Sequence, residues 1–142
     1  MVSPTQASFV PKRQITDNVV IMQEVLHTMR HKKGGKGYMA IKIDFEKAYD
    51  RMRWDFLKET LLLMQVPAKL VDVIYSCVST CSMSVLWNGV PTEVFQPTRG
   101  IRQGDPLSPY LFALGMERLV QMIEWEVTRQ RWKPISLCRN GP

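Results

Sequence analysis

The stretch Tyr38-Met-Ala-Ile-Lys-Ile-Asp-Phe-Glu-Lys-Ala-Tyr-Asp50 decides how we interpret the fold. Residues 38–43 are apolar and β-branched and follow a glycine-rich loop, which predicts a strand. The run ends on Asp44, and a carboxylate at the end of a buried strand needs a metal, a cation or water to offset its desolvation. The stretch therefore predicts the metal-holding strand of a nucleotidyl-transfer site. For Asp44 taken alone, a helix-capping aspartate is the open alternative.

A second stretch, Gly100-Ile-Arg-Gln-Gly-Asp-Pro-Leu-Ser-Pro109, combines turn residues with hydrogen-bond donors. Its glycines let the main chain approach a nucleotide closely, and Arg102 and Gln103 bring side-chain donors to it. Ser108 can cap a helix that has Pro109 at its first position, and the N-terminal end of such a helix attracts anions. We interpret this stretch as a nucleotide-binding loop, with an ordinary loop entering a helix as the alternative.

Helical spacing and turn residues predict the remaining elements. The prediction comprises a helix capped by Asp17, a helix over 54–65, a helix opened by Pro67, a hairpin within 83–95 turning at Asn88-Gly89, a helix from Ser108 to about Arg129, and an optional strand over 134–138. The residues expected to face the core are Phe56, Leu57, Leu61 and Met64, then Leu70, Val73, Ile74 and Cys77 or Val78, then Phe112, Met116, Leu119, Val120, Ile123 and Val127. The order predicts an α+β fold with a small antiparallel sheet packed by helices.

The charge pattern favours a polyanionic partner. The 142 residues carry a formal net charge of +6, with basic segments at 11–36 and 99–142 around a slightly acidic centre. No apolar run reaches the length of a membrane span, and the N-terminus lacks a signal-like apolar core. An odd cysteine count of three predicts buried thiols in a reducing compartment. We therefore expect an intracellular protein, in the cytoplasm or nucleus.

Together, the two stretches resemble a known family. Asp44-Phe-Glu-Lys-Ala-Tyr-Asp50 looks like motif A of the reverse transcriptase palm, and Gly100-Ile-Arg-Gln-Gly-Asp-Pro-Leu-Ser-Pro-Tyr-Leu-Phe112 looks like its motif B. The sequences of both motifs are similar to those of non-LTR (LINE-type) retrotransposons, notably plant ones, and the resemblance covers essentially the whole chain. It implies that 1–37 forms the end of the fingers and a helix before motif A, and that 38–142 forms a partial palm.

The resemblance also implies roles for single residues. Asp44 would be catalytic and would bind two Mg²⁺ (or Mn²⁺) ions, aided by the main-chain carbonyl of Phe45. Tyr49 would stack under the incoming sugar and select deoxynucleotides, and Gln103 and Gly104 would line the nucleotide pocket together with Phe45. Contacts to template or phosphate would come from Lys12, Arg13 and Arg102. The implied partners are an RNA template, a DNA primer and a deoxynucleoside triphosphate.

Parts of the family pattern are missing from these 142 residues. Motif C of the family contains an Asp-Asp pair, and this sequence has no such dipeptide; the thumb and part of the palm are also absent. Without motif C, the strand over 38–43 lacks its usual partner, which predicts an unpaired edge and an uncovered apolar face. We therefore expect this chain by itself not to polymerise DNA. The alternatives are a non-catalytic nucleic-acid-binding module and a fragment of a polymerase of the group II intron maturase or telomerase type.

Overall fold

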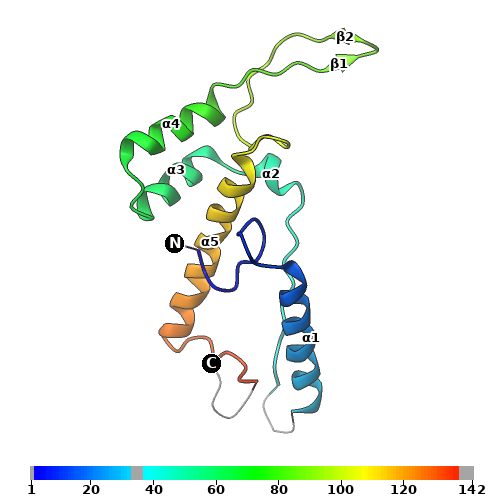
Figure 1. The fold of residues 1–142 in the computed structure, drawn as a ribbon, viewed down its shortest axis with the longest axis vertical. Helices are drawn as coiled ribbons and strands as arrows, with labels where there is room; N and C mark the ends of the chain where they lie inside the picture. Colours follow the sequence, from blue (N-terminus) through cyan, green and yellow to red (C-terminus); the bar gives the residue numbers. More distant parts are fainter. Residues whose placement is uncertain (1, 33–36, 138–142) are drawn as a thin grey trace. The chain divides into compact units, whose positions relative to one another are not determined.

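The computed structural model describes residues 2–32 and 37–137 and shows helices with one small antiparallel sheet (Figure 1). The elements are α1 (Ile15–His31), α2 (Ala48–Arg51), α3 (Trp54–Leu63), α4 (Ala68–Ser79), β1 (Leu86–Trp87), β2 (Val90–Pro91) and α5 (Ser108–Thr128). This mixed composition confirms the α+β class at a coarse level.

The chain forms two compact units. Phe45–Arg118 makes up the first unit, and Val2–Asp44 with Leu119–Pro142 makes up the second. Motif B and all of motif A except Asp44 therefore belong to the first unit. The assignment of 1–37 to fingers and 38–142 to palm stays a prediction.

The core of the first unit lies where α3 and α4 pack against each other and against the start of α5. Its buried members are Met52, Leu57, Leu61, Val71, Ile101 and Leu111. Leu57 and Leu61 are four residues apart, so they lie one above the other on the same face of α3. Met52 lies two residues after motif A, and Ile101 and Leu111 belong to motif B, so the core joins the segment that follows motif A to motif B.

The turn between α3 and α4 follows from its hydrogen bonds. Gln65 has a φ of 60°, and its N–H donates to the Leu62 carbonyl at 2.9 Å. The N–H of Val66 donates to the Leu61 carbonyl at 3.1 Å. These two bonds are the Schellman pattern that satisfies the last carbonyls of a helix. Pro67 follows as the N-cap residue of α4, one position before the first-turn position expected from the sequence.

The buried faces of α4 and α5 differ in part from those expected. On α4, Val71 is buried and Ile74 and Val78 pack against the core, whereas Leu70, Val73 and Cys77 are exposed. On α5, Leu111 and Ala113 are buried and Ile123 is exposed. A periodic pattern identifies an apolar stripe, but the neighbouring elements decide which part of the stripe is covered.

The predicted hairpin is confirmed. Asn88 and Gly89 have φ values of 48° and 81°, as the turn requires, and Leu86 pairs with Pro91 and Trp87 with Val90. The expectation that helices pack on this sheet is wrong, because all four strand residues are exposed. Figure 1 shows the hairpin extending beyond α4.

Two predicted strands do not form. Residues 37–44 have no assigned secondary structure and are exposed, with Met39 at 81% and Ile41 at 66%. A strand requires a hydrogen-bonded neighbour, and no part of 2–32 or 37–137 pairs with these residues. The uncovered apolar side chains expected for an unpartnered strand are present. Residues 134–137 also form no strand, and Cys138 lies outside the described residues.

The helix before motif A begins earlier than the sequence indicated. Gln14, not Asp17, is the N-cap residue of α1, and no side chain caps the helix. Asp17 lies in the first turn, where its negative charge favours the positive end of the helix dipole. Among the described residues, no helix has both the length and the apolar character needed to cross a bilayer.

Candidate functional site

Main-chain hydrogen bonds join the end of motif A to the start of motif B. The N–H of Ile101 donates to the Tyr49 carbonyl at 3.0 Å, and the N–H of Gly100 donates to the Met52 carbonyl at 2.7 Å. In addition, the indole Nε1–H of Trp54 donates to the Gly100 carbonyl at 2.6 Å. These bonds place α2 directly against the motif B loop, although the two segments are about fifty residues apart in the sequence.

Gly100 is required at this junction for two reasons. Its φ of 97° lies in the region that residues with a side chain rarely adopt. A Cβ atom there would also lie 3.1 Å from the main-chain oxygen of Asp50. The close approach of the two main chains therefore depends on the absence of a side chain.

Tyr49, the predicted sugar-selecting residue, is half-buried in the first unit. Its ring stacks on that of Phe112 of α5, with the centroids 5.0 Å apart and an angle of 17° between the ring planes. Such offset aromatic pairs stabilise by about 0.5–1.5 kcal/mol beyond the area they bury. The stack gives motif A and motif B a side-chain contact in addition to the main-chain bonds.

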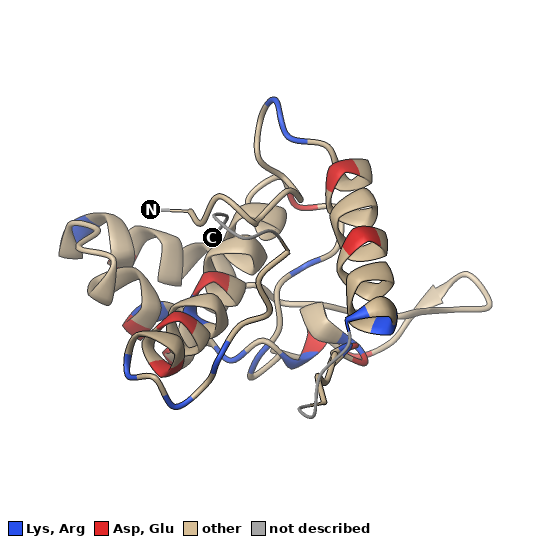
Figure 2. Ribbon diagram, turned by 90° about the horizontal axis from the view of Figure 1, so that it is seen from below, with Lys and Arg blue, Asp and Glu red and all other residues tan. Residues whose placement is uncertain are grey.

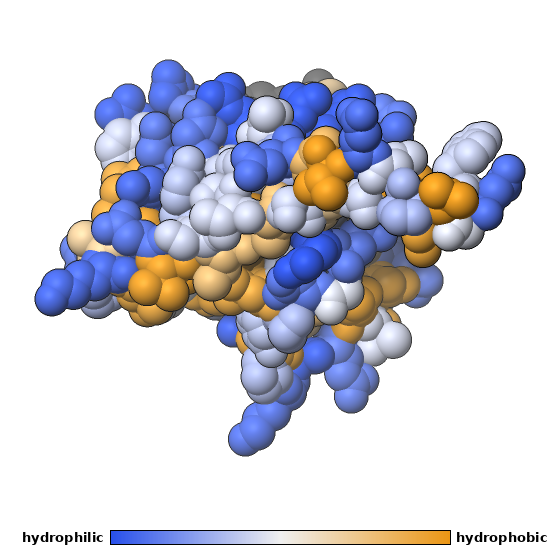
Figure 3. Space-filling model, turned by 90° about the horizontal axis from the view of Figure 1, so that it is seen from above, coloured by the Kyte–Doolittle hydropathy of each residue, from blue (hydrophilic) through white to orange (hydrophobic). Residues whose placement is uncertain are grey.

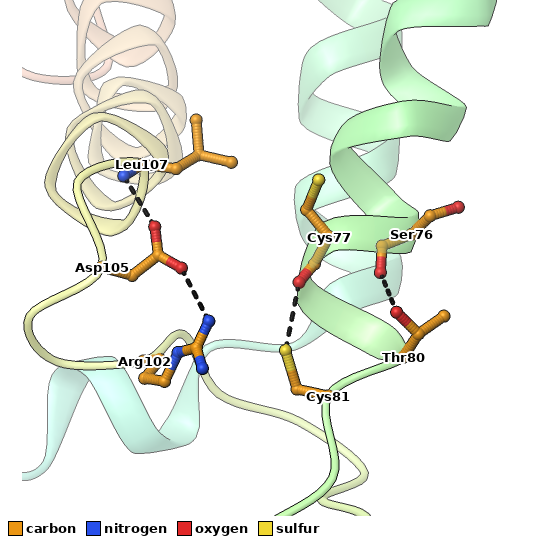
Figure 4. A network of polar contacts seen from close by, with 7 residues as sticks. All are labelled: Ser76, Cys77, Thr80, Cys81, Arg102, Asp105 and Leu107. Carbon is orange, nitrogen blue, oxygen red and sulfur yellow. Dashed lines mark hydrogen bonds and ion pairs between the residues drawn. The ribbon is translucent and has the colours of Figure 1, made fainter.

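Asp105 organises the motif B loop (Figure 4). Its Oδ1 accepts a hydrogen bond from the Leu107 N–H at 2.9 Å, and its Oδ2 lies 3.1 Å from Nη2 of Arg102. The Ser108 N–H donates to its main-chain oxygen at 3.1 Å. The Leu107 N–H bond, followed by the Arg102 guanidinium, lowers the pKa of Asp105 from its ordinary value of 3.8. The ionised carboxylate therefore holds the loop in place before α5 begins.

This arrangement predicts an acid dependence of stability. Because the pKa of Asp105 is lower in the folded state, the unfolded chain binds more protons at acid pH. The stabilisation is complete above pH 3.8 and is lost as the pH falls through the lower, folded-state value. We expect Asp105→Asn to remove this part of the pH dependence, measured by urea unfolding over the acid range. Arg102→Gln should remove a smaller part of the pH dependence than Asp105→Asn does, because the Leu107 N–H bond remains. A loss in Arg102→Gln equal to or larger than that in Asp105→Asn would contradict the assignment of the Leu107 bond as the main cause.

A pocket of about 510 Å³ opens beside this loop in the first unit. Gly100, Arg102 and Gln103 line one side, and Cys77 of α4 and Cys81, which follows this helix, line the other. Figure 4 shows Arg102 and Asp105 on one side and the two cysteines opposite. The expected burial of the thiols is therefore wrong for Cys77, which is exposed, and holds only in part for Cys81. The pocket lies where the loop was predicted to receive a nucleotide.

The other predicted site residues lie mostly at the surface. Asp44, Phe45, Gln103 and Gly104 are exposed, and Gly104 has a φ of 87°. Within the described part of the chain, no group of three or more His, Cys, Asp or Glu side chains is arranged to hold a metal ion.

The predicted template contacts divide into two kinds. Lys12 is exposed, as a phosphate contact requires. The guanidinium of Arg13 instead holds the N-terminal loop, because Nη1 donates to the main-chain oxygens of Ser3 at 2.5 Å and Gln6 at 2.6 Å. Arg102 is exposed but forms an ion pair with Asp105. The roles of these three residues stay predictions.

Comparison with known proteins identifies the family of this chain. The family model described as reverse transcriptase (RNA-dependent DNA polymerase) matches residues 1–136. The chain belongs to the reverse transcriptase family. It is 35% identical over 124 residues to the Retrovirus-related Pol polyprotein from type-2 retrotransposable element R2DM of Drosophila melanogaster. It is 30% identical over 128 residues to the 149 kDa protein of transposon TX1 of Xenopus laevis.

These alignments cover most of the chain but little of the relatives. They include 87% and 90% of this chain, and only 12% and 10% of the two relatives. A mitochondrial protein of Arabidopsis thaliana is 44% identical over 55 residues, which is 39% of this chain and 45% of that protein. The matches support a reverse transcriptase of the non-LTR type. The chain spans about a tenth of the length of these first two relatives.

Several residues that shape this part of the reverse transcriptase were missed by the sequence interpretation. Trp54 and Met52 follow motif A and bind the start of motif B. Trp54 was recognised only as part of the sequence pattern that follows motif A in the family, and its contact with Gly100 was not predicted. Asp105 could have been found, because an aspartate before a proline often bonds to a main-chain N–H two residues later. The contacts of Trp54 and Met52 depend on tertiary structure, so no local signal identifies them.

Proposed function

We propose that this chain supplies motifs A and B to a reverse transcriptase that adds deoxynucleotides to a primer 3′-hydroxyl, copying an RNA template. The observation that carries the proposal is the direct joining of the two motifs through Tyr49, Met52, Gly100 and Ile101. In this proposal the pocket beside Gln103 receives part of the incoming nucleotide, and Tyr49 lies under its sugar. The amino-acid sequences of both motifs support a plant-type non-LTR element as the source.

Reverse transcriptases use divalent metal ions, so the residues present must be tested against a metal site. Asp44 and the main-chain carbonyl of Phe45 offer the hard oxygen ligands that Mg²⁺ prefers. Two-metal catalysis of phosphoryl transfer needs further carboxylates, and the described residues form no such cluster. The donor chemistry fits, but it is incomplete within 2–32 and 37–137. In the proposed site, Asp44 and Phe45 hold metal ions together with carboxylates supplied from outside these residues.

A segment exchange in the Drosophila relative tests the proposal. The 124 matching residues of that polyprotein are replaced by this chain, and DNA synthesis is measured on a primed RNA template with Mg²⁺. We expect the exchanged protein to synthesise DNA and the 142-residue chain alone to give no product, because Asp44 lacks its partner carboxylates.

Two single variants of the exchanged protein then test the role of Asp44. Asp44→Asn should lower synthesis by more than about 100-fold, since even the outer-shell partners of metal ligands contribute 10–100-fold. Asp72→Asn is the matched control, because Asp72 is an exposed carboxylate on α4 that pairs only with Lys58 at the surface. A folded exchanged protein without activity, equal losses in both variants, or DNA synthesis by the 142-residue chain alone would contradict the proposal.

A further inference from the structure

The net positive charge of the chain arises entirely in the second unit. Residues 45–118 contain eight Lys and Arg and eight Asp and Glu, whereas residues 2–44 and 119–142 contain eleven and five. The formal net charge of +6 therefore arises outside the unit that carries most of motif A and all of motif B. A surplus of this size on one unit attracts polyanions to it.

Contacts within the second unit bring basic and aromatic side chains together after the end of α1. The ammonium of Lys32 donates to the Ser136 carbonyl at 3.0 Å and lies 5.2 Å from the centroid of the Tyr38 ring. Lys32 and Ser136 are 104 residues apart in the sequence. The end of α1 and the segment that follows α5 therefore meet at Lys32.

The end of α5 adds further basic and aromatic side chains to the second unit. Gln130 has a φ of 58°, and the N–H groups of Gln130 and Arg131 donate to the Val127 and Glu126 carbonyls, which is again the Schellman pattern. The guanidinium of Arg129 lies 4.2 Å from the centroid of the Trp125 ring. Trp125 remains 57% exposed and Trp132 52% exposed. This helix end thus presents two aromatic rings beside cationic groups.

We define the basic–aromatic patch as Lys32, Tyr38, Trp125, Arg129, Trp132 and Lys133. Arg131 is left out because its charge is paired with Glu126 at 2.6 Å. Figure 2 shows where Lys and Arg (blue) and Asp and Glu (red) lie along the ribbon. None of the six residues was predicted as a site residue, and none belongs to motif A or motif B.

We propose that the basic–aromatic patch binds single-stranded nucleic acid. Cations that follow a phosphate backbone, combined with exposed aromatic rings on which bases stack, are the two elements of such binding sites. An acidic peptide would be attracted by the cations but would leave the flat rings of Trp125 and Trp132 without stacking partners. In a duplex the bases are stacked on one another inside the helix, so they could not stack on these rings. The inference rests on the proposed function only in naming nucleic acid as the partner.

The test measures binding without catalysis. Labelled single-stranded RNA and single-stranded DNA are titrated with the full chain in EDTA, without metal ions or nucleotides, and binding is followed by fluorescence anisotropy. The double variant Trp125→Ala, Trp132→Ala should bind both strands roughly 5- to 100-fold more weakly, the range measured for the loss of one stacked base. Trp87→Ala is the matched control, because Trp87 is 73% exposed but lies in the neutral first unit.

A second pair of variants separates charge from stacking. Lys133→Gln should reduce the salt dependence of binding by about 0.7 in the logarithmic slope, the value for one phosphate contact to a single strand. Lys69→Gln, an exposed lysine of the first unit, should leave the slope unchanged. Heparin is a polyanion without bases. Its binding should be weakened by Lys133→Gln but unaffected by the tryptophan double variant.

The outcomes decide between this inference and its rivals. Far-UV circular dichroism checks that the tryptophan double variant is folded. The proposed role of the patch is wrong if this variant binds as tightly as the unchanged chain, or if Trp87→Ala weakens binding equally. Duplex bound as tightly as single strands would also overturn it. Because the assay contains no metal, normal binding by an exchanged polymerase that makes no DNA would refute the proposed function alone. An active exchanged polymerase whose patch variants bind normally would refute the patch alone.

Discussion

Gly100→Ala should destabilise the first unit by about 2–5 kcal/mol, because two separate costs add. An alanine at a φ of 97° costs about 1–2 kcal/mol relative to glycine. Its Cβ would also lie 3.1 Å from the Asp50 main-chain oxygen, and overpacking of this kind typically costs 1–3 kcal/mol. Relief of the contact would move Gly100 away from Met52 and Trp54 and weaken the bonds that join the two motifs.

Gly104→Ala is the matched control for Gly100→Ala. Gly104 has a φ of 87°, but a Cβ there would meet nothing within 4 Å. This variant therefore bears the backbone cost without the steric one, and we expect a loss of only about 1–2 kcal/mol. Urea unfolding followed by far-UV circular dichroism gives both values. Equal losses in the two variants would show that the contact with Asp50 contributes nothing.

Leu111→Ala should cost about 2–5 kcal/mol, the usual range for removing a large buried aliphatic side chain. Leu111 is 1% exposed in α5 and packs with Leu57, Leu61 and Val71 of α3 and α4. The truncation leaves a cavity at the point where all three helices meet. Since a small domain is stable by only 5–15 kcal/mol, much of the stability of the first unit would be lost.

Leu63→Ala separates this packing effect from helix propensity. Leu63 ends α3 and is 59% exposed, so the same change of residue type there leaves no cavity. We expect a change within about 0.5 kcal/mol, measured by the same urea unfolding. A loss at Leu63 comparable with that at Leu111 would contradict the core described for the first unit.

Elements with local signals were predictable from the sequence. Asn88-Gly89 determines the hairpin because both residues must adopt positive φ, and the spacing of Leu57 and Leu61 determines the inner face of α3. The family and the two motifs were recognisable because short, ordered sequence patterns carry them. Helix bounds were correct to within one or two residues for α3 and α5.

Features that depend on a partner were not predictable. Residues 38–43 have strand-like composition, but a strand forms only with a hydrogen-bonded neighbour, and the described residues provide none. The same composition leaves apolar side chains at the surface, among them Met39 and Ile41. Figure 3 shows hydrophobic residues, in orange, on one face of the molecule. The buried face of α4 depends on the position of α5, which no local pattern gives. The basic segments at 11–36 and 99–142 were visible in the sequence, but only the structure assigns the positive surplus to one unit.

The junction between motif A and motif B has a consequence for how this unit fluctuates. Two main-chain bonds, the Trp54 indole bond and the ring stack of Tyr49 on Phe112 all join the same two segments. Opening one link alone gains little conformational freedom while the others hold, so the links open together as one cooperative local unfolding event. A perturbation that loosens one motif is therefore felt by the other. The sugar-facing and base-facing sides of the proposed nucleotide site would be thermodynamically linked before any nucleotide arrives.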